Sequence, residues 1–171
     1  MELNVATELK LAGTIGHSEL TERFTDLELN GRQIVLTEPV RVDVSWSFDG
    51  DGFTLSGTLS SAVLMNCTKC NDEFIEAFSV DFTERFLRVG EAEAEELECY
   101  PYSGDVLVLD KMVEDLVLLN APMYGLCRPD CRGLCPICGT NLNNTQCSCT
   151  LPDEGNPFAA LKELKELLKD D

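Results

Sequence analysis

Apolar and polar residues alternate strictly in the first half of the chain. Between residues 41 and 48 every even-numbered residue is apolar and every odd-numbered residue is polar. Successive side chains of a β-strand point to opposite faces of a sheet, so this pattern predicts a strand with one face in the core. Trp46 lies on the apolar face, and we expect it in the core rather than on the surface as a stacking platform.

Two more strands are predicted to follow. Turn-forming residues occupy positions 49–52, after which Phe53, Leu55 and Leu59 resume the period of two and lead toward Met65. A third segment carries Phe74, Phe78, Val80, Phe82 and Phe86, all at even positions. The three segments predict an antiparallel meander.

Other elements are predicted from weaker or shorter patterns. We expect a short helix at residues 5–10 and a strand at 19–29. Residues 91–98 hold five glutamates and no base, which predicts a solvated loop, with an acidic contact for a basic partner as the alternative. Apolar residues at helical spacing predict an amphipathic helix near residues 110–121, packed on the sheet. They are Leu109, Met112, Val113, Leu116 and Val117.

These elements predict an α+β fold in three parts. Residues 1–126 form a β-rich domain with the helix near 110–121, residues 127–149 a Cys-rich zinc lobe, and residues 150–171 a linker and a C-terminal helix. Asn156 and Pro157 fit the start of that helix. We expect it to close the domain, with docking to a partner as the alternative.

The composition restricts the partners and the cellular location that we expect for this protein. The formal net charge is −18, which disfavours sequence-neutral binding to nucleic acid and favours a basic protein partner. No basic and apolar leader begins the sequence, and no stretch approaches the roughly 18 apolar residues of a membrane span. We therefore expect a cytoplasmic protein.

Eight of the nine cysteines divide into pairs at metal-ligand spacing. Zinc is commonly held by four thiolates contributed as two short-spaced pairs. We predict two zinc ions, although a single ion on Cys127, Cys131, Cys135 and Cys138 is an alternative. The predicted first site is Cys67, Cys70, Cys127 and Cys131, and the predicted second site is Cys135, Cys138, Cys147 and Cys149.

The zinc prediction changes the expected net charge, and other kinds of cysteine chemistry compete with it. Two filled sites would lower the formal charge to about −22. Lys69, Arg128 and Arg132 lie inside the cysteine motifs, as basic contacts for a partner or as groups that screen the thiolates. A secreted disulfide framework is less consistent with the absent leader. A thioredoxin-like CxxC would start a helix, whereas Cys67 and Cys70 lie in the connection between the second and third predicted strands. A rubredoxin-like iron site stays open.

No enzyme motif accompanies the cysteines. All-cysteine sites with four protein ligands are typical of structural rather than catalytic zinc. His17 is the only histidine, with no recognisable catalytic arrangement around it, and we expect it on the surface. Cys99 has no partner at ligand spacing and is expected to be a buried or free thiol.

The cysteine-rich segment resembles a known family. Residues 126–143 read LCxxxCxGLCPxCGxNLN, preceded by Ala121-Pro122-Met123 and followed by Asn156-Pro157-Phe158. This order resembles the YceD family, the large ribosomal RNA subunit accumulation proteins. The resemblance implies a cytoplasmic bacterial factor, without defined catalytic residues, that supports accumulation or processing of large-subunit (23S) ribosomal RNA.

Two hypotheses of function follow. The first is a ribosome-biogenesis adaptor that binds a basic ribosomal protein or a large-subunit assembly intermediate, with ribosomal RNA contacted indirectly or by the zinc lobe. The second is a redox- or metal-responsive protein whose cysteine sites open upon oxidation.

Overall fold

The computed structural model describes residues 1–11, 13–25, 27–29 and 31–150. They form two compact units: unit 1 comprises Met1–Cys67 and Asp72–Cys127, and the described residues of unit 2 are 68–71 and 128–150. The predicted three-part division stays a prediction. It did not group Thr68–Asn71 with the later cysteines, as the structure does. The predicted C-terminal helix lies outside the described residues.

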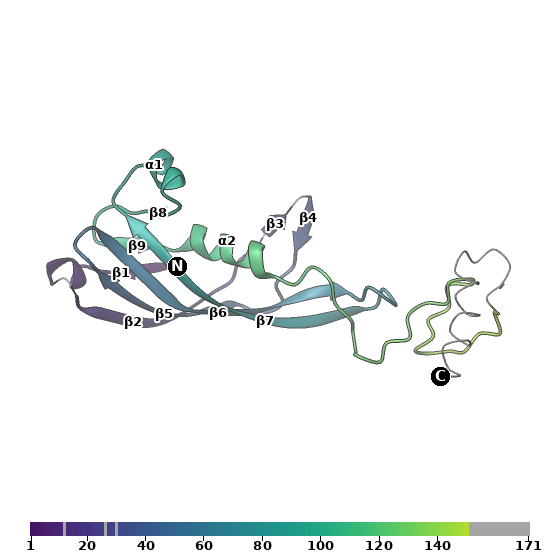
Figure 1. Ribbon diagram of the computed structural model, residues 1–171. Coiled ribbons are helices and arrows are strands. Elements are labelled where there is room, and N and C mark those ends of the chain that lie inside the picture. Colours follow the sequence, from purple (N-terminus) through teal and green to yellow (C-terminus); the bar gives the residue numbers. More distant parts are fainter. Residues whose placement is uncertain (12, 26, 30, 151–171) are drawn as a thin grey trace, which may run out of the picture. The chain divides into compact units, whose positions relative to one another are not determined.

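Unit 1 is built around a five-stranded sheet in the order β2–β5–β6–β7–β8 (Figure 1). All neighbours are antiparallel except β7 and β8. The predicted meander is therefore confirmed as β5, β6 and β7, and the α+β class is also confirmed. The strands are β2 (Ile15–Glu22), β5 (Val40–Phe48), β6 (Gly52–Asn66), β7 (Glu73–Leu87) and β8 (Tyr100–Pro101).

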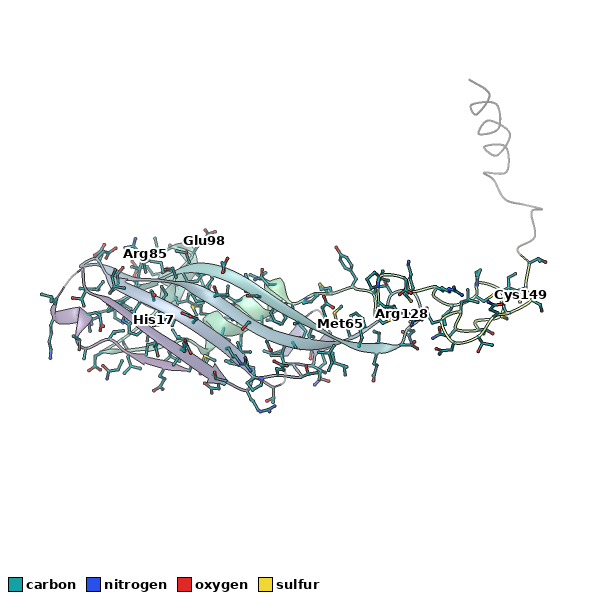
Figure 2. The ribbon with its side chains drawn as sticks, turned by 90° about the horizontal axis from the view of Figure 1, so that it is seen from below. His17, Met65, Arg85, Glu98, Arg128 and Cys149 are labelled. Atoms are coloured by element: carbon teal, nitrogen blue, oxygen red, sulfur yellow. The ribbon has the colours of Figure 1, made fainter. Side chains whose placement is uncertain are left out.

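One face of this sheet carries the core of unit 1. Val44, Phe53 and Phe86 are fully buried there, and Trp46 is 7% exposed, as its strand position predicted. The predicted amphipathic helix is α2 (Asp110–Asn120), which covers this face together with the paired strands β1 (Glu2–Asn4) and β9 (Val106–Val108) (Figure 1). The opposite face is polar and carries His17 (Figure 2).

The structure corrects two predictions for the N-terminal part of the chain. The predicted strand at 19–29 is divided between β2 and β3 (Leu27–Leu29), and β3 pairs with β4 (Arg32–Ile34) across a turn in which Gly31 has φ +78°. The predicted helix at 5–10 is only a 3-10 turn, Glu8–Lys10.

The acidic segment contains a helix instead of the predicted loop. It is α1 (Glu91–Glu96), in which Ala94 is buried and the N–H of Leu97 donates to the carbonyl of Glu93 at 3.0 Å. Glutamate and alanine favour helices, and one buried alanine gives this short helix an attachment to the rest of unit 1. Charge counting alone missed both effects.

The β6–β7 hairpin extends beyond the end of β5. Its second half is bordered on the β6 side by residues 35–37, since the N–H of Leu64 donates to Val35 at 2.9 Å and the N–H of Thr37 donates to Ala62 at 2.8 Å. At the tip, the N–H of Cys67 donates to the carbonyl of Asp72 at 2.8 Å. The first CxxC motif is therefore held on a paired hairpin.

Replacing Gly16 with alanine tests the packing of Trp46. A Cβ at Gly16 would lie 2.2 Å from Cε2 of Trp46, so the indole would have to move. We expect Gly16→Ala to lower the free energy of unfolding by roughly 1–3 kcal/mol, measured by urea denaturation. Gly90→Ala is the control, because no atom lies within 4 Å of its added Cβ. An equal effect of both variants would contradict this account.

Replacing Glu84 with glutamine tests a half-buried charge. Burial, and then the nearby Asp115 carboxylate, raise the pKa of Glu84. A raised folded-state pKa means that its favourable contribution is complete below the unfolded pKa and is lost as pH rises through the folded pKa. Glu84→Gln should thus raise the thermal midpoint at pH 7 and lose this advantage below about pH 4. Glu76 is exposed, so Glu76→Gln, the control, should change the thermal midpoint little. An effect of Glu84→Gln that does not depend on pH would refute the ionisation of Glu84 as its cause.

Candidate metal centres

The first CxxC forms a tight turn at the tip of the β6–β7 hairpin. Cys67 and Cys70 are both buried, and Asn71 follows them with φ 62°, in the left-handed region that asparagine tolerates better than most residues. This conformation reverses the chain immediately after the second cysteine. The turn therefore directs two thiols toward the same point, as a metal-binding knuckle requires.

Four sulfurs gather around this turn. Those of Cys67, Cys70, Cys127 and Cys131, here called the first cluster, all lie within 4.8 Å of one another. Cys127 is half-buried and the other three are buried. A tetrahedral zinc with Zn–S bonds of about 2.3 Å needs sulfurs about 3.8 Å apart. The first cluster fits such an ion with small side-chain adjustments.

A second knuckle repeats this backbone geometry in unit 2. Gly139 follows Cys138 with φ 71°, in the same left-handed region as Asn71. The N–H of Gly139 donates to the carbonyl of Cys135 at 2.9 Å, and the N–H of Cys135 donates to the carbonyl of Thr140 at 2.8 Å. Glycine at this position avoids the steric cost that a Cβ would impose.

The second cluster consists of Cys135, Cys138, Cys147 and Cys149. Their sulfurs also lie within 4.8 Å of one another. Only Cys135 is buried, Cys147 is half-buried, and Cys138 and Cys149 are exposed. The second cluster is therefore open to solvent on one side, while the first is largely enclosed.

The electrostatics of the second cluster favour a bound cation. Hydrogen bonds from Thr140, through its hydroxyl and its backbone N–H, lower the pKa of Cys138 to about 6. Backbone N–H groups of Cys138 and Ile137 lower the pKa of Cys135. The hydrogen bond with Cys138, followed by burial, raises the pKa of Cys149 to about 12. Four thiols this close cannot all ionise alone, and a divalent cation would remove that conflict.

The residues predicted as ligands are brought together in the two predicted groups. Within the described chain, Cys127, Cys131, Cys135 and Cys138 do not form one cluster, which disfavours the single-ion alternative. All-thiolate sets suit zinc or iron, and four protein ligands leave no open position for substrate. That these clusters bind zinc stays a prediction.

The three basic residues of the cysteine motifs have local contacts. Lys69 Nζ donates to the carbonyl of Cys131 at 3.4 Å, and Arg128 Nε lies 3.6 Å from an oxygen of Asp130. The backbone N–H of Arg132 donates to Asn143 Oδ1 at 2.8 Å. These contacts fit a role in supporting the cysteine loops; binding of a partner by these residues stays a prediction.

Sequence reasoning overlooked Asn143. Its side-chain amide donates to the sulfur of Cys131 at 3.4 Å, while its carbonyl oxygen accepts from Arg132. The amide therefore orients a predicted ligand from outside the cluster. The asparagine-rich loop after Gly139 was the available signal, but only the fold shows which asparagine reaches a sulfur.

A third group of side chains also escaped the sequence reading. His17 is exposed, as predicted, yet a ring nitrogen of it and carboxylate oxygens of Glu19 and Asp43 lie within 4.8 Å of one another. Strand alternation places His17 and Glu19 on one face, and pairing of β2 with β5 adds Asp43. All three are exposed.

Cys99, the remaining cysteine, is half-buried, and burial raises the pKa of its thiol.

The fold and the clusters define an acidic α+β protein with two tetracysteine centres. The sequence profile of the family described as "Large ribosomal RNA subunit accumulation protein YceD" matches residues 55–165, and the chain belongs to this family. The match includes both cysteine clusters and most of the β6–β7 hairpin. The resemblance inferred from the cysteine motifs is confirmed. The family description names an accumulation protein and not an enzyme.

Several relatives share part of the chain. An uncharacterized protein of Mycobacterium tuberculosis (strain ATCC 25618 / H37Rv) is 32% identical over 95 residues, which cover 54% of this chain and 46% of that protein. The chloroplastic large ribosomal RNA subunit accumulation protein YCED homolog 1 of Arabidopsis thaliana is 31% identical over 41% of this chain and 22% of that protein. Its counterpart in Zea mays is 37% identical over 30% of this chain and 17% of that protein.

The alignments span less than half of these relatives' lengths. No solved structure matches the chain. None of the helices among the described residues is long and apolar enough to cross a membrane.

Native mass spectrometry of the full chain tests the metal prediction. We expect two zinc ions in the wild type, and one ion in both Cys70→Ser and Cys138→Ser, because each variant removes a ligand from a different cluster. Cys99→Ser, the matched control, should retain two. Cys70→Ser should lower the thermal midpoint more, since the first cluster closes a longer loop. A single ion in the wild type, or a coloured iron protein, would refute the prediction.

Proposed function

We propose that this chain is a non-enzymatic factor in formation of the large ribosomal subunit, acting as an acidic zinc-binding adaptor for a basic ribosomal protein or assembly factor. Family membership supports the ribosomal part of the proposal, because the family description and the plant homologs refer to accumulation of large-subunit ribosomal RNA. The cytoplasm is the proposed location. The adaptor part is supported by the distribution of charge.

The acidity of the chain is concentrated in unit 1. That unit contains 24 of the 31 acidic residues and 7 of the 13 basic residues. Such a surface attracts cationic protein segments and repels phosphate backbones. This single observation favours a basic protein as the direct partner and indirect contact with ribosomal RNA.

The described part of unit 2 has a different balance. It contains Lys69, Arg128 and Arg132 against one carboxylate, Asp130. Four thiolates around one zinc would add two negative charges at each filled cluster. We therefore assign the lobe a structural role in the adaptor, with direct contact to RNA phosphates as the secondary version of the proposal.

One observation favours a second candidate function. Cys138 and Cys149 are exposed, so an oxidant such as peroxide has access to the second cluster. A redox- or metal-responsive protein would lose zinc there reversibly and change its partner. Measuring zinc release and partner binding together distinguishes this function from a constitutive adaptor.

Depletion and complementation in the host cell test the adaptor. We expect depletion to lower the ratio of large- to small-subunit ribosomal RNA, and the wild type to restore it. The chain should also co-purify with a basic ribosomal protein or assembly factor after ribonuclease treatment, with retention falling as salt rises. The double variant Arg128→Glu/Arg132→Glu should retain the basic protein as the wild type does. Retention of bare RNA alone, abolished by the double variant, would refute the adaptor.

A further inference from the structure

Within the part of the chain that the structure describes, the outer edge of β7 is a long strand edge without a strand partner over most of its length. β7 pairs with β6 along its whole length, but β8 borders it only at Phe86 and Leu87. No other strand among the described residues pairs with residues 73–84 on their outer side. Figure 1 shows β6 and β7 continuing together toward the hairpin tip. The opposite edge of the sheet, β2, has eight residues.

The register shows which backbone groups point outward. Antiparallel pairs alternate between hydrogen-bonded and non-bonded positions. The bond from Cys67 N–H to the Asp72 carbonyl is therefore followed by bonds to β6 from even-numbered residues of β7. Odd-numbered residues direct their N–H and C=O groups outward. Leu87 agrees with this rule, because its carbonyl accepts the N–H of Tyr102 at 3.0 Å.

Apart from its charged side chains, this edge lacks the features that usually prevent another strand from pairing. The register from Gly52–Leu87 to Asn66–Glu73 is continuous, without a bulge. Residues 73–84 include no proline, glycine or lysine. Natural edge strands are commonly protected by such residues, by bulges or by short length. The geometry of β7 is therefore suited to accept a strand.

The charges on β7 select the kind of strand that fits. Its open part carries the carboxylates of Glu73, Glu76, Asp81 and Glu84, and Asp81 accepts a hydrogen bond from Thr58 at 2.7 Å. Among the described residues none of the four has an ion-pair partner, and Arg85 of the same strand is paired with Asp49. A second copy of β7 would bring like charges together, whereas lysines or arginines would be attracted.

We propose that β7 binds an extended, basic segment of a protein by strand addition. Its outward N–H and C=O groups would supply the backbone bonds, and its carboxylates would select basic side chains. Half-buried Phe78 and Val80 on one face, and exposed Ile75 on the other, offer apolar contacts. The inference rests on the proposed function, since it assigns the surface by which the adaptor holds its partner.

A proline substitution tests the edge without removing β6 pairing. Ala77 is exposed and odd-numbered, so Ala77→Pro removes an outward N–H and leaves the bonds to β6. Ala77→Val is the matched control, because it keeps the N–H. The probe is a synthetic peptide of about nine residues that alternates lysine with valine, and its glutamate–valine counterpart tests charge. Peptide affinity and residue-resolved amide hydrogen exchange are measured on the full chain.

We expect the lysine peptide to slow exchange at odd-numbered amides of β7 and to leave β2 unchanged. Ala77→Pro should weaken its affinity by more than about tenfold, while Ala77→Val stays within about twofold. The double variant Glu73→Lys/Glu76→Lys should also lose the peptide, and gives a second test if the proline variant does not fold. Equal binding of the acidic peptide, protection at β2 instead, or dimers formed through β7 would overturn the inference.

The peptide assay tests the strand-addition inference, and the cellular assay tests the proposed function, so either can be wrong without the other. If Ala77→Pro binds the peptide as well as the wild type does, yet the wild type restores large-subunit ribosomal RNA and retains a basic protein, only the strand-addition inference is wrong. If the peptide binds at β7 but depletion leaves ribosomal RNA unchanged, the proposed function is wrong.

Discussion

The pairing of β6 with β7 is the constraint on which most of unit 1 depends. Each strand has 15 residues, and all of them are paired in one continuous register. A slip by one residue would exchange the buried and exposed faces of a strand, so burial of Phe53 and Phe86 on one face strongly disfavours it. The same register holds Cys67 and Cys70 at the tip and sets which amides of β7 point outward.

The two cysteine clusters share a backbone geometry but differ in their surroundings. Each begins from a CxxC turn that is followed by a left-handed residue, Asn71 in one and Gly139 in the other. The first cluster is largely enclosed, whereas two thiols of the second are exposed. Enclosure slows access of oxidants and chelators to a metal site, so the two clusters have unequal chemical exposure despite equal ligand sets.

Charge is distributed unequally between the two units. Nearly all of the described acidic residues belong to unit 1, which also contains the open edge of β7, while the described cysteine loops carry only Asp130. A polar sheet face and an acidic edge leave backbone hydrogen bonding and charge as the main means of recognition there. These means favour an extended cationic polypeptide over a small molecule or a nucleic acid.

The amino-acid sequence by itself determined the local features of this protein. Period-two alternation identified β5, β6 and β7, helical spacing identified α2, and short cysteine spacings with the run at residues 126–143 indicated the family. These signals are local because each depends on neighbours a few residues apart. The same kind of reasoning was wrong for α1, where the burial of Ala94 outweighs the charge run. Tertiary structure alone decided that Asn143 reaches Cys131 and that Glu19 and Asp43 meet His17. It also decided that, among the described residues, no strand but β8 borders the outer edge of β7. Those facts depend on strand order and on contacts between distant segments, which no local pattern encodes.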